Sequence, residues 1–158
     1  MGYVSTPNSQ LPTPNSQLPT PKELACLAAV LLDMDAADWT IRDRPYDIRE
    51  RLFNFACVIA RMAQFLRTQG PIAVELSAQL LKSGTSAGAN YEEADDGSSP
   101  RDVLAKRRIV LRELKETSFR LRVLRKAGIL APAHDPVINE CAELVRIVGA
   151  LIRNSGPT

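Results

Sequence analysis

The sequence holds very little of the side-chain chemistry on which most enzymes depend. His134 is the only histidine, and the three cysteines, Cys26, Cys57 and Cys141, stand far apart with no C-x-x-C pair. This set excludes a zinc site of ordinary ligand spacing and leaves no Ser-His or Cys-His pair. Neither the Glu-x-x-His motif of di-iron bundles nor a P-loop or dinucleotide fingerprint occurs. We therefore predict a protein that is not an enzyme and uses no metal and no cofactor.

Long apolar runs are also missing. The nearest candidate, Leu24 to Leu32, is far shorter than the roughly 18–20 residues of a membrane span. A polar stretch precedes it, and Asp33 and Asp35 follow where a signal peptide would carry small residues. The odd number of thiols favours a reducing compartment. These features predict a cytoplasmic protein with no membrane contact.

The N-terminal part contains a perfect tandem repeat, PNSQLPT, over Pro7–Thr20. Its Pro, Asn, Ser and Gln content predicts disorder or polyproline-like chain, which could serve as a Pro-rich ligand. However, the DNA heptanucleotide CCCAACT, repeated, translates into the same peptide. We therefore interpret residues 1–33 as a disordered, repeat-derived extension, with Met1 and Met34 both open as the translation start.

The remaining chain predicts an all-α fold, an antiparallel up-down four-helix bundle over residues 46–154, with a lead-in at 34–45 and a tail at 155–158. Helices are expected at about 47–69, 71–96, 100–127 and 136–154. Ser99 and Asp135 are expected to cap the third and fourth helices, with Pro100 and Pro136 at their first positions. No segment shows a period-two strand pattern, and short loops make successive helices antiparallel neighbours.

Apolar residues recur at helical spacing along each predicted helix. The expected core stripes are Ile48, Leu52, Phe55, Ile59, Met62 and Leu66; then Val103, Val110, Leu114, Thr117, Leu121 and Leu124; then Val137, Cys141, Leu144, Val148 and Leu151. The second helix carries Ile72, Leu76, Leu80 and Leu81. The first and last helices have more apolar surface than one core needs, which favours a homo-oligomer.

One stretch within the second helix, KSGTSAGANYEEA at 82–94, is unusually rich in small and hydroxyl residues. Gly84 and Gly88 lie four apart, as do Ser83 and Ala87, so small residues share one face and permit a close helix contact. A functional interpretation makes Ser83, Thr85, Ser86, Asn90 and Glu93 a polar site. We favour packing and a structural hydrogen-bond network, in which buried Asn90 and Glu93 would need partners.

This stretch closely resembles the signature of the 23S ribosomal RNA intervening-sequence proteins, a family of four-helix bundles. The family pattern, basic-Ser-small-Thr-Ser-apolar-Gly/Pro-Ala-Asn-apolar-x-Glu-small, is matched by Lys82, Ser83, Gly84, Thr85, Ser86, Ala87, Gly88, Ala89, Asn90, Tyr91, Glu92, Glu93 and Ala94. The segments Gln79–Leu81, Leu114–Thr117 and Leu124–Leu130 also look like the family, so the resemblance covers residues 46–154.

The resemblance implies a compact bundle that assembles into a ring-like homopentamer. One subgroup of the family comprises accessory proteins that bind the reverse transcriptase of diversity-generating retroelements. This chain departs from the pattern at two positions. Arg120 stands where an aromatic residue is common, and Ala87 replaces the usual Val or Ile.

The distribution of charge is more informative than the net charge of +2. Residues 101–126 hold ten Lys or Arg against three acids, a net of +7, whereas residues 71–97 hold one Lys against five acids, a net of −4. Six basic residues follow helical spacing opposite the third helix's core stripe and define what we call the basic stripe. They are Arg101, Arg108, Arg112, Lys115, Arg122 and Lys126.

Such a stripe favours contacts with phosphates of RNA or DNA, although it could also be a solvated face neutralised by neighbouring acids. Phe119 and Val123 lie near it and could stack on bases, but we favour packing against another chain. The acidic run Glu92, Glu93, Asp95 and Asp96 is expected to be a solvated helix end that attracts basic neighbours.

The sequence thus predicts a non-enzymatic, homo-oligomeric four-helix bundle that binds nucleic acid through the basic stripe. Two alternatives stay open. One is an accessory protein for a retroelement reverse transcriptase, and the other is a structural or regulatory oligomer that binds no nucleic acid.

Overall fold

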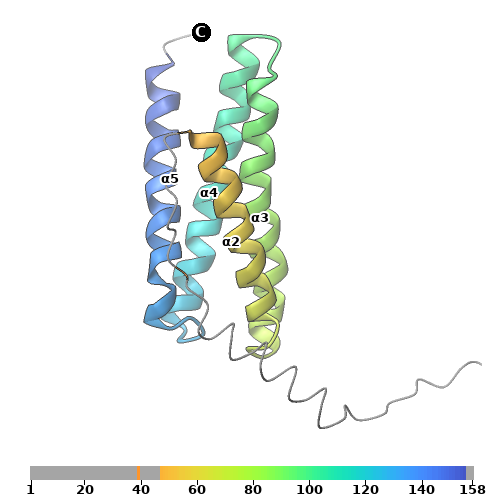
Figure 1. Cartoon of the computed structure of the whole chain (residues 1–158), viewed down its shortest axis with the longest axis vertical. Coiled ribbons are helices and arrows are strands. Elements are labelled where there is room, and N and C mark those ends of the chain that lie inside the picture. Colours follow the sequence, from red (N-terminus) through yellow and green to blue (C-terminus); the bar gives the residue numbers. More distant parts are fainter. Residues whose placement is uncertain (1–38, 40–46, 156–158) are drawn as a thin grey trace, which may run out of the picture. The chain divides into compact units, whose positions relative to one another are not determined.

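The computed structural model describes Trp39 and residues 47–155. Within this part, four α-helices and one short 3₁₀-helix follow each other: α2 (Ile48–Leu66), α3 (Pro71–Asp95), α4 (Pro100–Lys126), η1 (Pro132–His134) and α5 (Asp135–Asn154). Successive helices run in opposite directions (Figure 1). The predicted all-α four-helix bundle is therefore confirmed. The predictions for residues 1–33, most of the lead-in and the last three residues of the tail lie outside the described residues.

Local signals in the sequence account for most helix ends. The hydroxyl of Ser99 accepts a hydrogen bond from the backbone N–H of Asp102 at 3.2 Å, and Pro100 occupies the first turn, as predicted. Helix α2 ends three residues earlier than expected, because Thr68 and Gln69 close turns onto Phe65 and Leu66. Gly70, with φ of +102°, then reverses the chain before α3.

The predicted cap of the last helix is wrong. Asp135 is the first residue of α5 rather than its cap, and no side chain caps this helix. The Asp135 carboxylate instead accepts a hydrogen bond from Arg125 Nε at 2.7 Å. The Asp135 carboxylate therefore makes a charge-assisted hydrogen bond to α4 and does not cap the start of α5.

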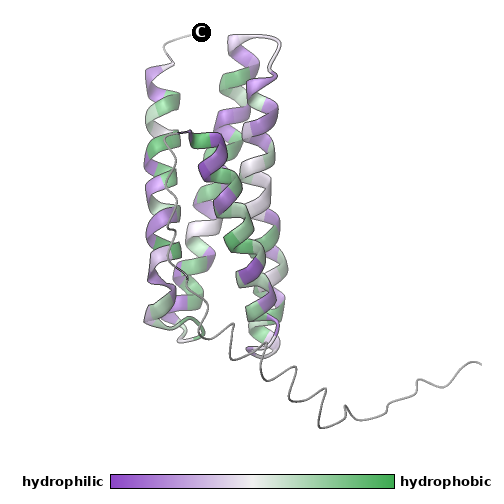
Figure 2. Ribbon diagram, viewed as in Figure 1, coloured by the Kyte–Doolittle hydropathy of each residue, from purple (hydrophilic) through white to green (hydrophobic). Residues whose placement is uncertain are grey.

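The core forms where the four helices meet, and the predicted stripes of α2, α4 and α5 supply most of it. The side chains that are at most 1% exposed include Leu52, Phe55, Ile59, Met62, Leu66, Val110, Leu114, Leu121, Leu124, Val137, Leu144 and Val148. Polar residues are interspersed along every helix, so none is apolar all round (Figure 2). No helix among the described residues is both long and apolar enough to cross a bilayer.

Helix α3 packs against both α2 and α4 through its small residues. Its apolar Ile72 is 69% exposed, whereas Ala73, Ser77, Ser83, Gly84 and Ala87 are buried. A Cβ atom on Gly84 would lie 2.6 Å from Cγ2 of Ile59 in α2, closer than real Cβ contacts come. At Gly88 the nearest atom, the Leu52 carbonyl oxygen, would be 3.7 Å away. Both glycines therefore face α2, but a Cβ atom is excluded at Gly84 alone and would make ordinary van der Waals contact at Gly88.

Helices α2 and α5 meet through a buried ion pair. Arg51 donates to both carboxylate oxygens of Glu140, from Nε at 2.5 Å and from Nη2 at 2.9 Å. Its Nη2 also lies 3.0 Å from Glu143 Oε2. The hydrogen bond to Glu140 raises the pKa of Arg51, which stays charged. Glu140 is fully buried, so this pair is part of the core.

Aromatic rings cover the end of the core where α2 ends and α5 begins. Trp39 is 6% exposed, and its ring centroid lies 5.0 Å from that of His134 and 6.1 Å from that of Phe65. The ring centroids of His134 and Phe65 are also 5.0 Å apart. Trp39, a residue of the predicted lead-in, thus contributes to the core.

We expect Gly84→Ala to lower the free energy of unfolding by about 1–3 kcal/mol, because the new methyl group overpacks the contact with Ile59. Gly88→Ala is the matched control. It should be neutral or stabilising by up to about 1 kcal/mol, since alanine favours the helix and has room there. Urea titration followed by circular dichroism measures both.

An Ile59→Ala background gives the contact a direct test. The cost of Gly84→Ala should shrink there, because the side chain that it would strike has been removed. An equal cost in both backgrounds would show that Gly84 is not constrained by Ile59.

Candidate nucleic-acid interface

Neighbouring helices bind four of the ten basic residues at 101–126. Lys106 pairs with Glu93 of α3, and Arg125 pairs with Asp135 of α5. The Arg107 guanidinium lies 6.0 Å from the ring centroid of Tyr91 in α3, in a cation–π arrangement. Arg120 pairs with Glu116 at 3.1 Å and also reaches α3. These four contacts hold α4 against α3 and α5.

The other six basic residues are those of the predicted basic stripe, and all of them are exposed. Among the described residues, the ion pairs of this set are limited to that of Arg112 with Glu113 at 3.0 Å. The Arg112 side chain nevertheless stays 66% exposed. The stripe spans 25 helical steps, about 38 Å at 1.5 Å per residue. It is long enough to contact several phosphates.

Two apolar side chains lie within the same face of α4. Phe119 is 65% exposed and Val123 is 36% exposed. A hollow of about 380 Å³ lies on the α3 side of them and includes Leu76, Arg112 and Lys115 in its lining. A second, of about 590 Å³, lies on the α5 side and includes Arg122, Lys126 and Ile138. Both volumes fall within the roughly 300–1,000 Å³ of ligand pockets.

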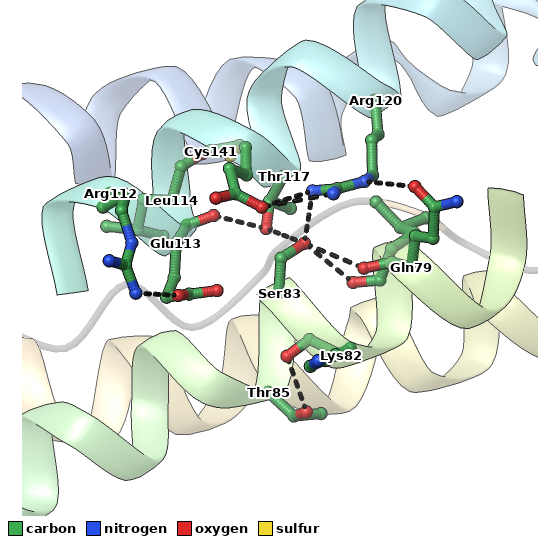
Figure 3. A network of polar contacts seen from close by, with 12 residues as sticks. Gln79, Lys82, Ser83, Thr85, Arg112, Glu113, Leu114, Thr117, Arg120 and Cys141 are labelled. Carbon is green, nitrogen blue, oxygen red and sulfur yellow. Dashed lines mark hydrogen bonds and ion pairs between the residues drawn. The ribbon is translucent and has the colours of Figure 1, made fainter. Parts of the chain in front are cut away.

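The centre of the family-like stretch lies behind this face, in a hydrogen-bond network between α3 and α4 (Figure 3). The hydroxyls of Ser83 and Thr117 are 2.8 Å apart, and both residues are buried. Arg120 Nη1 donates to Ser83 Oγ at 3.3 Å, and its Nε donates to Gln79 at 3.4 Å. Arg120, which departs from the family pattern, thus joins the network as a donor. Ser83 therefore has a structural role.

The other polar residues of the stretch bond mainly within α3. Asn90 Nδ2 donates to the Ser86 carbonyl at 2.9 Å and to the Ser86 hydroxyl at 3.1 Å. The Thr85 hydroxyl donates to the Leu81 carbonyl at 2.8 Å. Lys82, Thr85, Ala89 and Glu93 are exposed, and Ser86 and Asn90 are half-buried. The structure therefore does not gather these side chains into one polar site.

Basic residues neutralise part of the acidic end of α3, as predicted. Arg49 Nε donates to Asp95 Oδ2 at 3.0 Å, and this bond raises the pKa of Arg49. Together with the Lys106–Glu93 pair, it offsets an unfavourable run of acids at a helix C-terminus. Among the described residues, no group of three or more His, Cys, Asp or Glu could hold a metal ion.

Of the described cysteine and histidine side chains, Cys141 and His134 lie in packing environments. Burial raises the pKa of the Cys141 thiol to about 12, and the Glu140 carboxylate adds to this effect. A thiol with that pKa is a poor nucleophile at neutral pH. His134 is buried against Trp39 and Phe65, and its Nδ1 accepts a hydrogen bond from the Ala131 N–H at 3.1 Å. Cys57 is exposed.

Sequence reasoning missed the buried Arg51–Glu140 pair, although a signal was present. Glu140 stands beside Cys141, three residues after Val137 and four before Leu144, within the apolar register of α5. Arg51 occupies the equivalent place beside Leu52 in α2. Two opposite charges within two core stripes indicate a buried ion pair.

The fold and the exposed basic helix define a class, a four-helix bundle with one positively charged face. A solved structure is similar to the chain. It is a protein of unknown function from the S23 ribosomal protein family of Bacteroides thetaiotaomicron, with 28% identity and a TM-score of 0.63. The match covers 68% of this chain and 99% of that protein. No protein-family model and no curated protein matches the sequence.

This likeness supports the resemblance at the level of the S23 ribosomal protein family fold. The relation to retroelement accessory proteins stays a prediction.

We expect Ser83→Ala to lower the free energy of unfolding by about 1 kcal/mol, because Thr117 and Arg120 lose a buried partner. Thr85→Ala is the matched control, since its hydroxyl is exposed and bonds only within α3. It should change stability by less than about 0.5 kcal/mol. Chemical denaturation provides both values. A Ser83→Ala protein as stable as the parent would show that the hydrogen-bond network does not stabilise the fold.

Proposed function

We propose that this protein is a non-enzymatic, homo-oligomeric nucleic-acid-binding protein, and that the basic stripe of α4 contacts phosphates. This proposal rests on a difference among the basic residues at 101–126, some of which contact other helices while the rest face solvent. Four of them contact α3 or α5, and the remaining six face solvent in one helical register, with Arg112 paired only to Glu113 of its own helix. Contacts within the subunit thus explain why the first four residues are basic. Recognition of a polyanion explains the other six basic residues.

The chemistry of the stripe suits phosphate binding. Four of its six residues are arginines, whose planar guanidinium groups can donate two parallel hydrogen bonds to one phosphate. Each neutralised phosphate releases counterions, so binding should weaken steeply as the salt concentration rises. Glu93 and Asp95 of α3 pair with Lys106 and Arg49, so these two acids do not neutralise the stripe.

Exposed apolar surface supports the homo-oligomer. Phe53 on α2 is 57% exposed, and Val74 and Leu81 on α3 are 42% and 38% exposed. These residues belong to helices other than α4. An oligomer that covers them would leave the basic stripe available in every subunit, so the subunits together could present a continuous positive belt. The pentamer is the assembly that the family resemblance implies.

A structural or regulatory oligomer without nucleic acid is the second candidate, and the same apolar surface on α2 and α3 favours it. The accessory role for a reverse transcriptase stays a prediction from the family resemblance.

The triple variant Arg108→Glu, Arg112→Glu, Arg122→Glu should reduce nucleic-acid affinity by at least about 100-fold, since three phosphate contacts become repulsive. Helicity should not change, because the three side chains are exposed. The matched control, Arg61→Glu, Arg67→Glu, Arg146→Glu, makes the same change in net charge at exposed sites outside α4. Fluorescence anisotropy with labelled RNA and DNA over a salt series measures affinity.

The control separates a local interface from a general charge effect. Equal losses of nucleic-acid affinity in both variants would show that binding depends on the overall charge rather than on the basic stripe. A parent protein that binds neither RNA nor DNA at low salt would overturn the proposed function and favour the second candidate.

A further inference from the structure

The basic stripe has one gap in its C-terminal half, and an aromatic ring fills it. From Arg108 the stripe advances by four and three residues to Lys115, and then by seven to Arg122. Phe119 lies four residues after Lys115 and three before Arg122, at the missing position of the same helical register. The ring therefore stands within the line of positive charges.

The surroundings of Phe119 are open on two sides. The ring takes part in lining both hollows, with Arg112 and Lys115 on the α3 side and Arg122 and Lys126 on the α5 side. It is the most exposed aromatic side chain among the described residues, at 65%. A planar group can thus approach the ring while its charged substituents reach cations on either side.

We propose that Phe119 is a stacking platform for unpaired nucleotides, so that the stripe binds single-stranded rather than duplex nucleic acid. This inference rests on the proposed function and specifies its substrate class. Each base of a single strand has an exposed face that can stack on an aromatic ring, while the adjacent phosphates meet a basic groove. The bases of a duplex are stacked on each other, and a ring on a convex helix surface cannot reach their faces.

Charge argues against a protein partner at this position. Interface cores are enriched in aromatic residues and arginine but depleted in lysine, and a partner that covered Phe119 would desolvate Lys115 and Lys126 along with the two arginines around it. A nucleic-acid strand supplies a phosphate for each of these cations together with an aromatic face for the ring. Among exposed phenylalanines, Phe53 offers a comparison, because it is 57% exposed on α2 and lies outside the basic stripe.

The test compares Phe119→Leu with Phe53→Leu in the full chain. Labelled oligouridylate and oligothymidylate of about 12 nucleotides, within the roughly 4–16 of known stacking sites, are the single-stranded probes. A duplex of equal length is the third probe. Phe119→Leu should weaken binding to both single strands roughly 5- to 150-fold, the loss expected for one stacked base. The parent should bind the duplex more weakly than either single strand. This weaker duplex binding and the salt dependence should not change in Phe119→Leu, because no charge is removed.

Two further proteins sharpen the result. Phe53→Leu should bind all three probes like the parent. Phe119→Trp should retain single-strand affinity, because a larger ring replaces the original one. Circular dichroism and light scattering on the same samples report folding and oligomer mass.

Failure of this inference is distinct from failure of the proposed function. If Phe119→Leu binds single strands like the parent while the triple arginine variant does not, the stacking platform is overturned and the phosphate interface stands. A change in oligomer mass with Phe119→Leu would place the ring against a second copy and would also overturn the platform. If the parent binds none of the probes, both proposals fall.

Discussion

The close approach of α3 to its two neighbours is the constraint on which the rest of the bundle depends. Gly84 leaves no room for a Cβ atom against Ile59 of α2. One residue earlier, the Ser83 hydroxyl meets Thr117 of α4 at 2.8 Å. Adjacent residues thus fix the separation of three helices, because larger side chains at either position would force the backbones apart. This spacing lets the long apolar residues of α2 and α4 fill a shared core.

The orientation of α4 follows from that packing. Its core stripe is held against α3 and α5, so the opposite side of the helix must face solvent. Lys106 and Arg125 form ion pairs with acids of α3 and α5 and so stabilise this orientation of α4. The exposed stripe is therefore a consequence of how the core packs. Glu93 and Asp95 of α3 pair with Lys106 and Arg49 instead of with the stripe.

The buried ion pair of Arg51 and Glu140 connects the first and last described helices of the bundle. Burying Arg51 and Glu140 costs desolvation energy, which their short bidentate contact offsets. An apolar pair could pack with equal stability, and we expect that it would constrain the alignment of α5 less. The charged pair requires one alignment, because Glu140 has to meet the guanidinium group within the core. This contact thus contributes specificity to the register of α2 and α5.

The sequence by itself determined the fold class, the helix starts at Ser99 and Pro71, most of the core and the register of the basic stripe. These features depend on local periodicity and capping, which act within one helix. Only the tertiary structure decided that Gly84 is constrained and Gly88 is not, that Asp135 binds Arg125 rather than capping α5, and that Arg51 meets Glu140. It also showed which basic residues are paired. Each of these outcomes depends on the distance between atoms of different helices, and spacing along one helix carries no information about that distance.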